Sequence, residues 1–501
     1  MSIKEQMKRY NEIQQLLAAY NLCISTVYFD KLTIAPKSGV SETNKSLGMI
    51  STEYFKIVTG EEYVGIVSNL YKNRDKLNDI NNRKITLAYK NIEDLKNIPE
   101  KEYTEYQILC GNSEAAWEKA KEEHDYSIFE PYLLKVIEYQ KKFCNYRNPD
   151  KSAYELLLDD YEEGMTIDKY DEFFTLVKNE LVPLIKKINL KSEMVDDSII
   201  TGKFSVKKQE RVMKFLKRYL GFNDSWGYMG VSAHPFTSGL SNNDVRITTA
   251  YDENNISSSI FSVIHETGHA TLEHQVAKKF DGTIIKSSLT SAIHESQSRL
   301  FENNLGRSKE FWVSNYPKLQ RIFKKEFENV TLDEFIRAIN SSKPSFVRTE
   351  SDELTYSIHI LIRYEIEKGI FDGTIDVNNL KEVWNQKYYQ HLGVKVEDDS
   401  LGILQDIHWS DGSFGYFPTY SLGSAYAAQI ENTMRKELDV DYLLSNNQMR
   451  VINKWLKGNL HQYGALYSPN KLLLKVTGEE FNPKYYIKYL KEKYSKLYDV
   501  K

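Results

Sequence analysis

Residues 262–274, SVIHETGHATLEH, contain two histidines four positions apart and a glutamate directly after the first. Residues four apart lie on one face of a helix, about one turn from each other, so His265 and His269 can aim both imidazoles at one ion. Glu266 is rotated by about 100° from His265, where it can reach a water molecule without being a ligand. We therefore predict a zinc site with two histidine ligands and a neighbouring base.

The surroundings of this motif support a helix. SSSIFSVI (257–264) offers serines that can cap a helix and an apolar stripe that can be buried beside the ligand face. Gly268 is disfavoured in a helix by about 1 kcal/mol relative to alanine, so either it is tolerated or another segment approaches the backbone beside His269. His274 lies five positions after His269, which turns it away from the ligand face and predicts a surface or packing histidine.

A catalytic zinc needs a third protein ligand and an open position for water. The next helix-like segment, TSAIHESQSRLFENNLG (290–306), offers His294 and Glu295, which project about 100° apart, so only one of them is expected to coordinate. Glu295 lies on a polar stripe that includes Glu302, whereas His294 borders apolar residues. The helical wheel does not decide between them, although a polar stripe facing a cleft favours Glu295.

The rest of the chain predicts a mostly helical protein. Only 11 prolines and 24 glycines interrupt its 501 residues, and long segments carry apolar residues at three- and four-residue spacing. KSEMVDDSIITGK (191–203) is the best linker candidate, which divides the chain into approximate subdomains 1–195 and 196–501. DVRITTAY (244–251) reads as a short strand, and as an edge strand near the zinc it could hold an extended peptide through main-chain hydrogen bonds.

Composition argues against several classes of partner. The net charge of −4 gives no reason to expect nucleic-acid binding. Three scattered cysteines, Cys23, Cys110 and Cys144, indicate reduced thiols in a cytoplasmic protein. The charged amino terminus lacks the features of a signal peptide, and no uncharged apolar run of about 18 residues predicts a membrane span.

Several separate motifs together resemble one known family. HETGH is followed, 26 positions after its last histidine, by Glu295 within HESQ; SAHPFT (232–237), DVRIT (244–248) and GILQDIHW (402–409) also match family motifs. The chain thus resembles the carboxypeptidase Taq metallopeptidases, zinc enzymes that remove single residues from peptide carboxyl termini. VRTESD (347–352) departs from the family's R-x-x-A-D by one serine, and YFDKLTIAPKSG is a loose version of the family's opening.

The resemblance has consequences for fold, ligands and assembly. It implies a mainly α, large helical zinc-peptidase fold with a deep substrate groove and a small β element beside the active site. Residues 1–501 would form a single peptidase domain, with 1–195 as a helical cover and 196–501 as the catalytic part. It also implies Glu295 rather than His294 as the third ligand, and a homodimer. Zn²⁺ is the expected cofactor, with Co²⁺ as an alternative because imidazole and carboxylate ligands accept either.

The expected reaction needs further side chains. Glu266 would act as general base, taking a proton from water and returning it to the departing amine. His408 or Tyr420 would donate to the developing oxyanion. Arg348 is our choice for binding the free terminal carboxylate, because a guanidinium can bind it with two parallel hydrogen bonds; its alternative is an ion pair within TESD (349–352).

Four more residues are candidates for substrate binding. Arg246 would help to close the far end of the groove according to the resemblance, although it could simply pair with Asp244. His234 is expected to line the groove or pack in a turn rather than bind metal, because a proline follows it and it has no helical partner. Gln405 and Asp406 could orient substrate, but residues with a purely structural role would look identical in sequence.

Three functions remain open from the sequence, and the first is favoured. They are a carboxypeptidase acting on peptides with a free carboxyl terminus, a zinc endopeptidase or oligopeptidase with an open-ended groove, and a non-catalytic helical binding protein. The first requires a carboxylate-binding arginine and a blocked groove end, whereas the second would cut amidated peptides internally. The third would leave function unchanged after Glu266→Gln.

Overall fold

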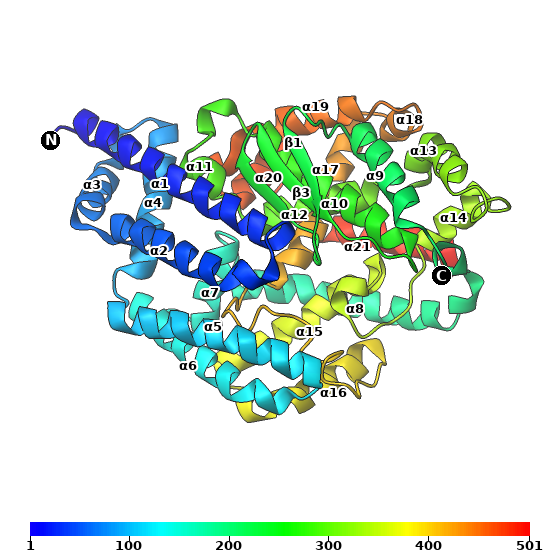
Figure 1. Ribbon diagram of the computed structural model, residues 1–501, viewed down its shortest axis with the longest axis horizontal. Helices are drawn as coiled ribbons and strands as arrows, with labels where there is room; N and C mark the ends of the chain where they lie inside the picture. The colour runs from blue at the N-terminus through cyan, green and yellow to red at the C-terminus, as the bar shows by residue number, and fades with distance from the viewer. Residues whose placement is uncertain (501) are drawn as a thin grey trace.

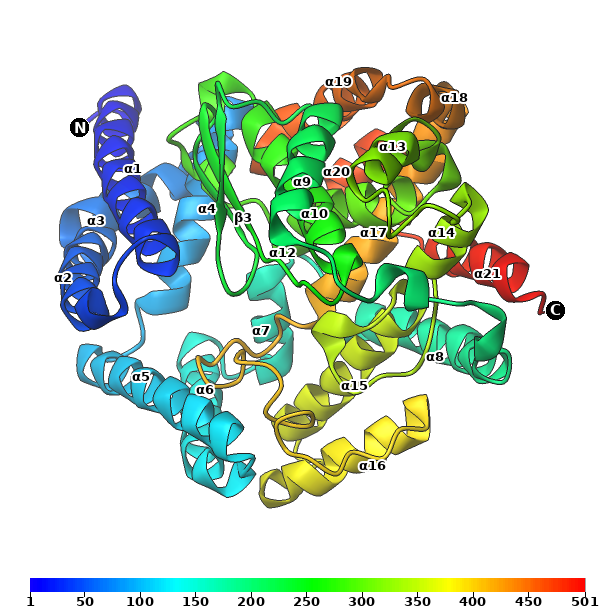
Figure 2. The same cartoon turned by 45° about the vertical axis from the view of Figure 1, so that its right-hand side comes forward.

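The computed structural model describes residues 1–500 and is mainly α, as predicted (Figure 1). The helices before the sheet are α1 (Ile3–Thr33), α2 (Val40–Thr59), α3 (Glu61–Lys72), α4 (Asp79–Leu95), α5 (Glu100–Glu123), α6 (Glu130–Arg147), α7 (Ala153–Tyr161), α8 (Ile167–Asn189) and α9 (Val206–Leu220). The predicted linker at 191–203 forms only two short 3-10 turns between α8 and α9. Helices α1–α4 gather at one end of the molecule (Figure 2).

The remaining helices form the other end and the centre of the molecule. They are α10 (Ile256–Gln275), α11 (Ile284–Ser287), α12 (Ser291–Arg299), α13 (Lys309–Ile322), α14 (Leu332–Ile339), α15 (Glu353–Asp372), α16 (Leu380–Leu392), α17 (Pro418–Glu437), α18 (Val440–Ser445), α19 (Met449–Asn459), α20 (Pro469–Thr477) and α21 (Lys484–Tyr498). A π-helical turn, η7 (Leu300–Leu305), continues α12, and a short 3-10 turn, η8 (Arg348–Glu350), precedes α15. No helix within residues 1–500 carries an apolar stretch long enough to cross a membrane.

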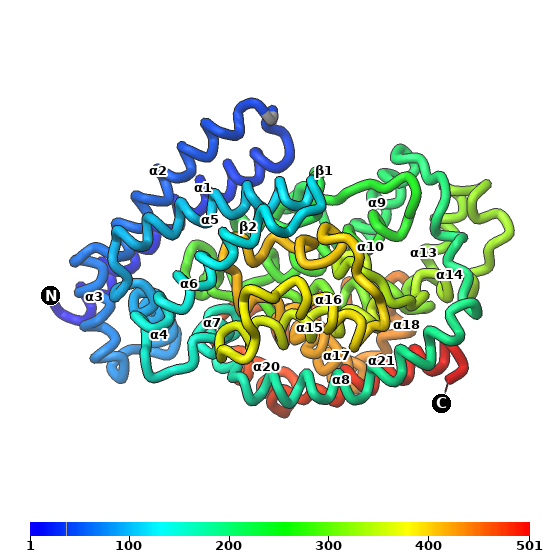
Figure 3. The backbone as a smooth tube through the Cα atoms, turned by 90° about the horizontal axis from the view of Figure 1, so that it is seen from below, coloured from blue at the N-terminus to red at the C-terminus, as the bar shows by residue number. Residues whose placement is uncertain are grey.

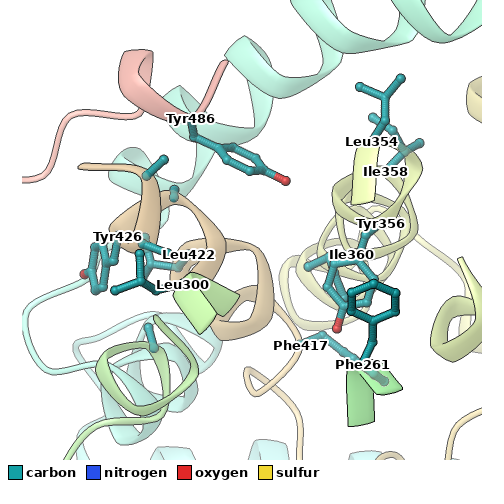
Figure 4. Packing of buried hydrophobic residues seen from close by; sticks show 14 of the residues in the cluster. Phe261, Leu300, Leu354, Tyr356, Ile358, Ile360, Phe417, Leu422, Tyr426 and Tyr486 are labelled. Atoms are coloured by element: carbon teal, nitrogen blue, oxygen red, sulfur yellow. The ribbon is translucent and has the colours of Figure 1, made fainter. Parts of the chain in front are cut away.

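The hydrophobic core has two main parts. A large cluster joins α5–α8 to the helices from α9 onward, and Figure 4 shows a portion of it that includes Tyr356 and Phe417. A smaller cluster is built by α1–α4 together with a few residues of 276–285 and Ala465. Viewed from below, α1 and α2 project beyond the rest of the chain (Figure 3). The division between these two clusters falls between α4 and α5.

One small sheet is present in the order β1-β3-β2. Strand β1 (Gly227–Val231) pairs with β3 (Asp244–Thr249) in parallel, and β2 (Thr237–Ser241) pairs with β3 in antiparallel fashion, with a bulge at Gly239/Ser241. The predicted strand at 244–251 is confirmed as β3, but its expected place at the edge is wrong. Strand β3 is central, so its main-chain groups are already paired, and the edge that packs on α10 is β2.

Helix α12 is packed tightly between α10 and α17. A Cβ on Gly268 of α10 would lie 2.5 Å from the Gln297 carbonyl oxygen and 2.7 Å from the Ser298 Cα. A Cβ on Gly423 of α17 would lie 2.6 Å from the Glu295 Cγ. Both glycines thus permit a close backbone approach. Of the two readings that the sequence left open for Gly268, the close approach is correct.

Candidate metal centre and groove

Helix α10 brings His265, Glu266 and His269 to one place. Asn255 caps its first turn by accepting a hydrogen bond from Ser257 N, so the cap is not one of the serines that the sequence suggested. Twelve of its twenty residues are buried, which anchors the helix firmly in the core. The two imidazoles are mostly buried, with side chains 18% and 14% exposed, and their ring centroids are 4.9 Å apart.

Glu295 of α12 completes a set of three ligands. Its Oε2 lies 3.8 Å from His265 Nε2 and 3.5 Å from His269 Nε2, and one atom from each residue fits within 4.8 Å of the other two. Ligand atoms around a tetrahedral zinc ion are about 3.3–3.6 Å apart. The three side chains therefore fit one divalent cation. Within residues 1–500 no other group of three such residues has this geometry, and His294 is not part of it.

The charges around this set also suit a cation. Burial alone would raise the pKa of Glu295, but Arg299 and the two histidines outweigh it and hold the pKa well below its usual value. Burial lowers the pKa of His269 to about 3, so this imidazole is neutral. For His265, burial is outweighed by the Glu295 carboxylate, which raises the pKa and shows that the site attracts positive charge. A charged carboxylate at Glu295 and a neutral imidazole at His269 are states that metal binding requires.

His265 is held from behind by a charged cluster. Its Nδ1 lies 2.8 Å from Oε2 of Glu302, which lies within the π-helical turn η7. Arg299 donates to Glu302 at 3.0 Å and to Glu295 Oε1 at 2.6 Å, and Arg307 donates to Glu302 at 3.4 Å. One arginine thus fixes both a ligand and the partner of another ligand. Burial would raise the pKa of Glu302, but the nearby Arg299 outweighs it and lowers the pKa to about 2, so Glu302 is charged.

His269 has a different set of partners. Its Nδ1 lies 2.6 Å from His294 Nδ1, and His294 Nε2 lies 3.0 Å from Glu273 Oε1. Lys286 Nζ lies 3.7 Å from Glu273 Oε2 and 3.2 Å from Asp281 Oδ1. Glu273, Lys286 and His294 also line a cavity of about 300 Å³ between the amino-terminal helices, β2 and α11.

Glu266 lies beside the ligands and is tied to the edge strand. The hydroxyl of Thr237, the first residue of β2, donates to Glu266 Oε2 at 2.6 Å. The Glu266 side chain is buried, and burial raises its pKa. One carboxylate oxygen is therefore fixed by Thr237, which leaves the other free of any hydrogen bond to the described residues.

His408 and Tyr420 lie together near Glu295. His408 Nε2 is 3.1 Å from the Tyr420 hydroxyl, and burial lowers the pKa of His408 to about 4, so the imidazole is neutral at neutral pH. Its Nδ1 is buried without a partner among the described residues. Tyr420 lies one turn before Gly423, the residue of α17 that touches Glu295. Of the two predicted oxyanion donors, Tyr420 is thus the one next to the ligand set.

Arg348 pairs with neither acidic residue of the TESD segment that follows it. Its Nε and Nη2 donate to Asp406 Oδ1 at 3.1 and 2.7 Å, and its Nη1 donates to the Tyr356 hydroxyl at 3.0 Å. Arg363 holds the other oxygen of Asp406 at 2.6 Å. Tyr356 in turn presents its ring to Arg299 at 4.2 Å. A single tyrosine therefore separates Arg348 from the arginine that anchors Glu295.

Gln405 and Asp406 form their hydrogen bonds with other groups of the protein. Gln405 Oε1 accepts from the Arg348 backbone N at 2.8 Å and from Arg363 at 2.7 Å, and its amide nitrogen donates to three backbone carbonyls. Asp406 lies between the two guanidinium groups. These two residues hold the backbone and the side chain of Arg348.

The last two predicted residues lie at the sheet. Arg246 forms a two-point ion pair with Asp244, at 2.9 and 2.8 Å, and its guanidinium lies 5.4 Å from the Phe29 ring of α1. His234 is exposed on the loop between β1 and β2, three residues before Thr237. His274 packs against Trp226, with ring centroids 4.1 Å apart, as predicted for a packing histidine.

Sequence reasoning missed several residues of the site. The sequence offers His294 only as an alternative metal ligand and gives no role to Glu273, Arg299, Thr237 and Tyr356. Arg299 could have been found, because it lies four residues after Glu295 and i,i+4 pairs meet on a helix. Glu302 was noted on the polar stripe without a role. The others depend on contacts between distant segments and leave no local signal.

Comparison with known proteins places the whole chain in one family. The family profile described as carboxypeptidase Taq (M32) metallopeptidase matches residues 2–494. Carboxypeptidase 1 of Bacillus subtilis (strain 168) is 40% identical over 499 residues, covering 99% of this chain and 100% of that protein. Among solved structures, Pyrococcus furiosus carboxypeptidase has a TM-score of 0.94 at 33% identity, covering 98% of this chain and 99% of that one. Trypanosoma cruzi metallocarboxypeptidase 1 has a TM-score of 0.94 at 31% identity, covering 98% and 100%.

Proposed function

Because the chain belongs to the carboxypeptidase Taq family of metallopeptidases, it is a metallocarboxypeptidase, and we propose that it works with a zinc ion held by His265, His269 and Glu295. The observation that carries this proposal is the fit of three ligand atoms within 4.8 Å of one another. Two imidazoles and one carboxylate would leave a fourth position for water. Cobalt suits the same ligands, so availability would decide between the two metals.

Zinc, when bound, would polarise the scissile carbonyl and lower the pKa of water toward 7. Glu266 would take the proton of the attacking water on the carboxylate oxygen that Thr237 leaves free. It would then return this proton to the departing amine, so that one carboxylate serves as base and as acid. The hydrogen bond from Thr237 keeps the side chain in the orientation that both steps need.

Tyr420 would stabilise the oxyanion, with His408 as its support. If His408 Nε2–H donates to the Tyr420 oxygen, the tyrosine keeps its own O–H for the oxyanion, which needs a fixed donor in a water-poor site. The neutral state of His408 is compatible with this direction of the hydrogen bond.

Arg348 would bind the free carboxylate of the substrate. A guanidinium has five N–H bonds, and the contacts to Asp406 and Tyr356 occupy three of them, which leaves one on each terminal nitrogen. Two such N–H bonds can bind a carboxylate in parallel. Gln405 and Asp406 would contribute indirectly, by fixing this arginine.

The edge strand β2 would hold the peptide main chain. It begins at Thr237, beside Glu266, and continues to Gly239 and Leu240, which line the cavity of about 300 Å³. Main-chain pairing with such an edge does not depend on side chains, so broad specificity would follow. His234, in the loop before β2, and Arg246, in the central strand β3, would line and close the groove.

The test compares one unblocked peptide with its carboxyl-amidated twin. Each is incubated with zinc-loaded protein and followed by mass spectrometry, with Glu266→Gln as the inactive control. We expect the unblocked peptide to shorten one residue at a time from its carboxyl end, while the twin and the control reactions stay intact. Internal cuts in both peptides would favour an endopeptidase and refute the role of Arg348.

We also propose a cytoplasmic homodimer, on the strength of the family resemblance and of cysteine usage. Cys23, Cys110 and Cys144 are all free thiols, and two of them are buried, which suits a reducing compartment. Sedimentation equilibrium of the 58.4 kDa chain distinguishes a dimer from a monomer. A single species at the monomer mass across micromolar concentrations would exclude the dimer.

A further inference from the structure

The second nitrogen of His269 is bonded to another imidazole. His269 Nε2 faces Glu295 at 3.5 Å, so Nδ1 is the nitrogen left over for a partner, and that partner is His294 Nδ1 at 2.6 Å. The His294 ring continues to Glu273, whose Oε1 lies 3.0 Å from His294 Nε2. Three side chains on two helices thus form one line that leads away from the proposed metal site.

With a metal ion on His269, only one placement of protons satisfies the hydrogen bonds that link His269, His294 and Glu273. A metal on His269 Nε2 requires the proton on Nδ1, which then donates to His294 Nδ1. His294 must therefore carry its proton on Nε2, and this N–H donates to the Glu273 carboxylate, which can only accept. Every nitrogen has a partner in this arrangement, and both imidazoles are neutral.

Glu273 is itself held firmly. Lys286 balances its charge at 3.7 Å and is fixed by Asn242 Oδ1 at 2.8 Å and by Asp281 at 3.2 Å. The main chain of Gly239 packs directly on the Glu273 carboxylate, where a Cβ would lie only 2.4 Å from Oε2. The end of the line is thus a fixed anion rather than a mobile surface group.

We propose that His294 is a positioning residue for His269, and that Glu273 fixes the tautomer of His294. The proposal rests on the metal site proposed above. Partners of this kind orient a ligating imidazole and raise its basicity, and their loss typically weakens metal binding about 10–100-fold. His294 is thus assigned a role in metal affinity, although it is not in the ligand set.

The experiment measures zinc affinity by competition with a fluorescent chelator, which needs no turnover. The variants are His294→Ala, His294→Asn, Glu273→Gln and the double variant of His294→Ala with Glu273→Gln. His269→Ala marks the loss of a true ligand. The matched control is His124→Asn, which removes an exposed histidine from the end of α5 and keeps a residue that tolerates the left-handed backbone there.

We expect His294→Ala to weaken zinc binding about 10–100-fold. Glu273→Gln should weaken it several-fold, and the double variant should be no worse than His294→Ala, because Glu273 acts through His294. His294→Asn should recover much of the affinity, since its Oδ1 can accept from His269. The visible spectrum of the cobalt-loaded protein should change in His294→Ala and stay unchanged in His124→Asn, while the unfolding midpoint of the metal-free protein stays within a few degrees of wild type.

Four outcomes would overturn the proposal. Unchanged zinc affinity in His294→Ala would mean that the contact is only structural, and a loss as complete as in His269→Ala would make His294 a ligand. If the effects of the Glu273 and His294 substitutions on zinc affinity are additive, Glu273 does not act through His294. If His294→Ala does not fold, wild-type affinity in both His294→Asn and Glu273→Gln contradicts the proposal. A wild-type protein that binds no zinc would instead refute the metal site itself.

Discussion

The two histidines of the metal centre are supported in different ways. His265 meets a carboxylate directly, since Glu302 lies in the core between Arg299 and Arg307. His269 meets a second imidazole, and its carboxylate, Glu273, lies one residue further out at the wall of a cavity. We therefore expect loss of the charged partner in the core to lower both metal affinity and stability, and loss of the partner at the cavity wall to lower metal affinity alone.

The strongest way to test this difference is a matched pair, Glu302→Gln and Glu273→Gln. The first removes the charge between two buried arginines, and we expect it to reduce the free energy of unfolding by about 3 kcal/mol and zinc affinity by about 10–100-fold. The second leaves Lys286 paired with Asp281, so it should lower zinc affinity only several-fold, with little change in stability. Chemical denaturation and chelator competition measure both quantities. Equal losses of stability in the two variants would remove the distinction.

Both histidines lie on α10, and their partners His294 and Glu302 lie on α12 and on its continuation η7. Gly268→Ala would push α10 and α12 apart where they cross. The added Cβ would lie 2.5 Å from a backbone oxygen that cannot rotate away, so we expect a loss of about 1–3 kcal/mol in stability together with weaker zinc binding. Gly65→Ala is the control, because no atom lies within 4 Å of its added Cβ in α3. There, alanine should stabilise the protein by about 0.5–1 kcal/mol. A neutral result for Gly268→Ala would show that α12 moves freely.

The amino end of α12 offers a pH-dependent test. Glu162 accepts from Ala292 N at 3.1 Å, and burial raises the pKa of Glu162 to about 8. The folded state therefore holds a proton that the unfolded state loses above about pH 4.5, so this contribution to stability is complete below pH 4.5 and is lost as the pH rises through 8. Between these values wild type should lose up to about 1.4 kcal/mol per pH unit relative to Glu162→Gln. Parallel stability–pH curves for the two proteins would contradict this.

Thr237→Val changes a residue that belongs neither to the partners of His265 nor to those of His269. It removes the hydrogen bond to Glu266 but touches no partner of either histidine. We expect kcat to fall roughly three- to tenfold, about the worth of one hydrogen bond, with zinc affinity unchanged. Steady-state kinetics and chelator competition, with Thr237→Ser as the variant that keeps the hydroxyl, check this. A loss of zinc affinity in Thr237→Val would link the edge strand to the metal site.

Local periodicity explains what the sequence could predict. The spacing of His265, Glu266 and His269 is a property of one helix, and the mostly helical fold follows from apolar spacing along the chain. The choice of Glu295 over His294 needed the family resemblance, because a helical wheel shows which residues share a face but not what lies opposite. The resemblance implies Glu295, whose carboxylate lies within 4.8 Å of both histidines, and it says nothing of a role for His294.

Contacts between distant segments explain what the sequence could not predict. The segment 244–251 is the strand that the sequence predicts, and the strands β1 and β2 that pair with it on both sides carry a weak strand pattern, so the central place of β3 leaves no signal in the sequence. The ion pair of Arg348 was sought among its neighbours, but its partner Asp406 lies 58 positions away. The pairing of Arg246 with Asp244, two residues apart, was by contrast foreseen as an alternative.

Helix α12 is nine residues long and lies in backbone contact with α10 on one side and α17 on the other. Arg299 holds Glu295 in place as well, so the position of this ligand is set by packing and by an ion pair within the chain. Such a site keeps its shape when it is empty. Chelation should therefore strip the metal without unfolding the protein, and added zinc should restore activity at the rate of ion entry rather than of refolding.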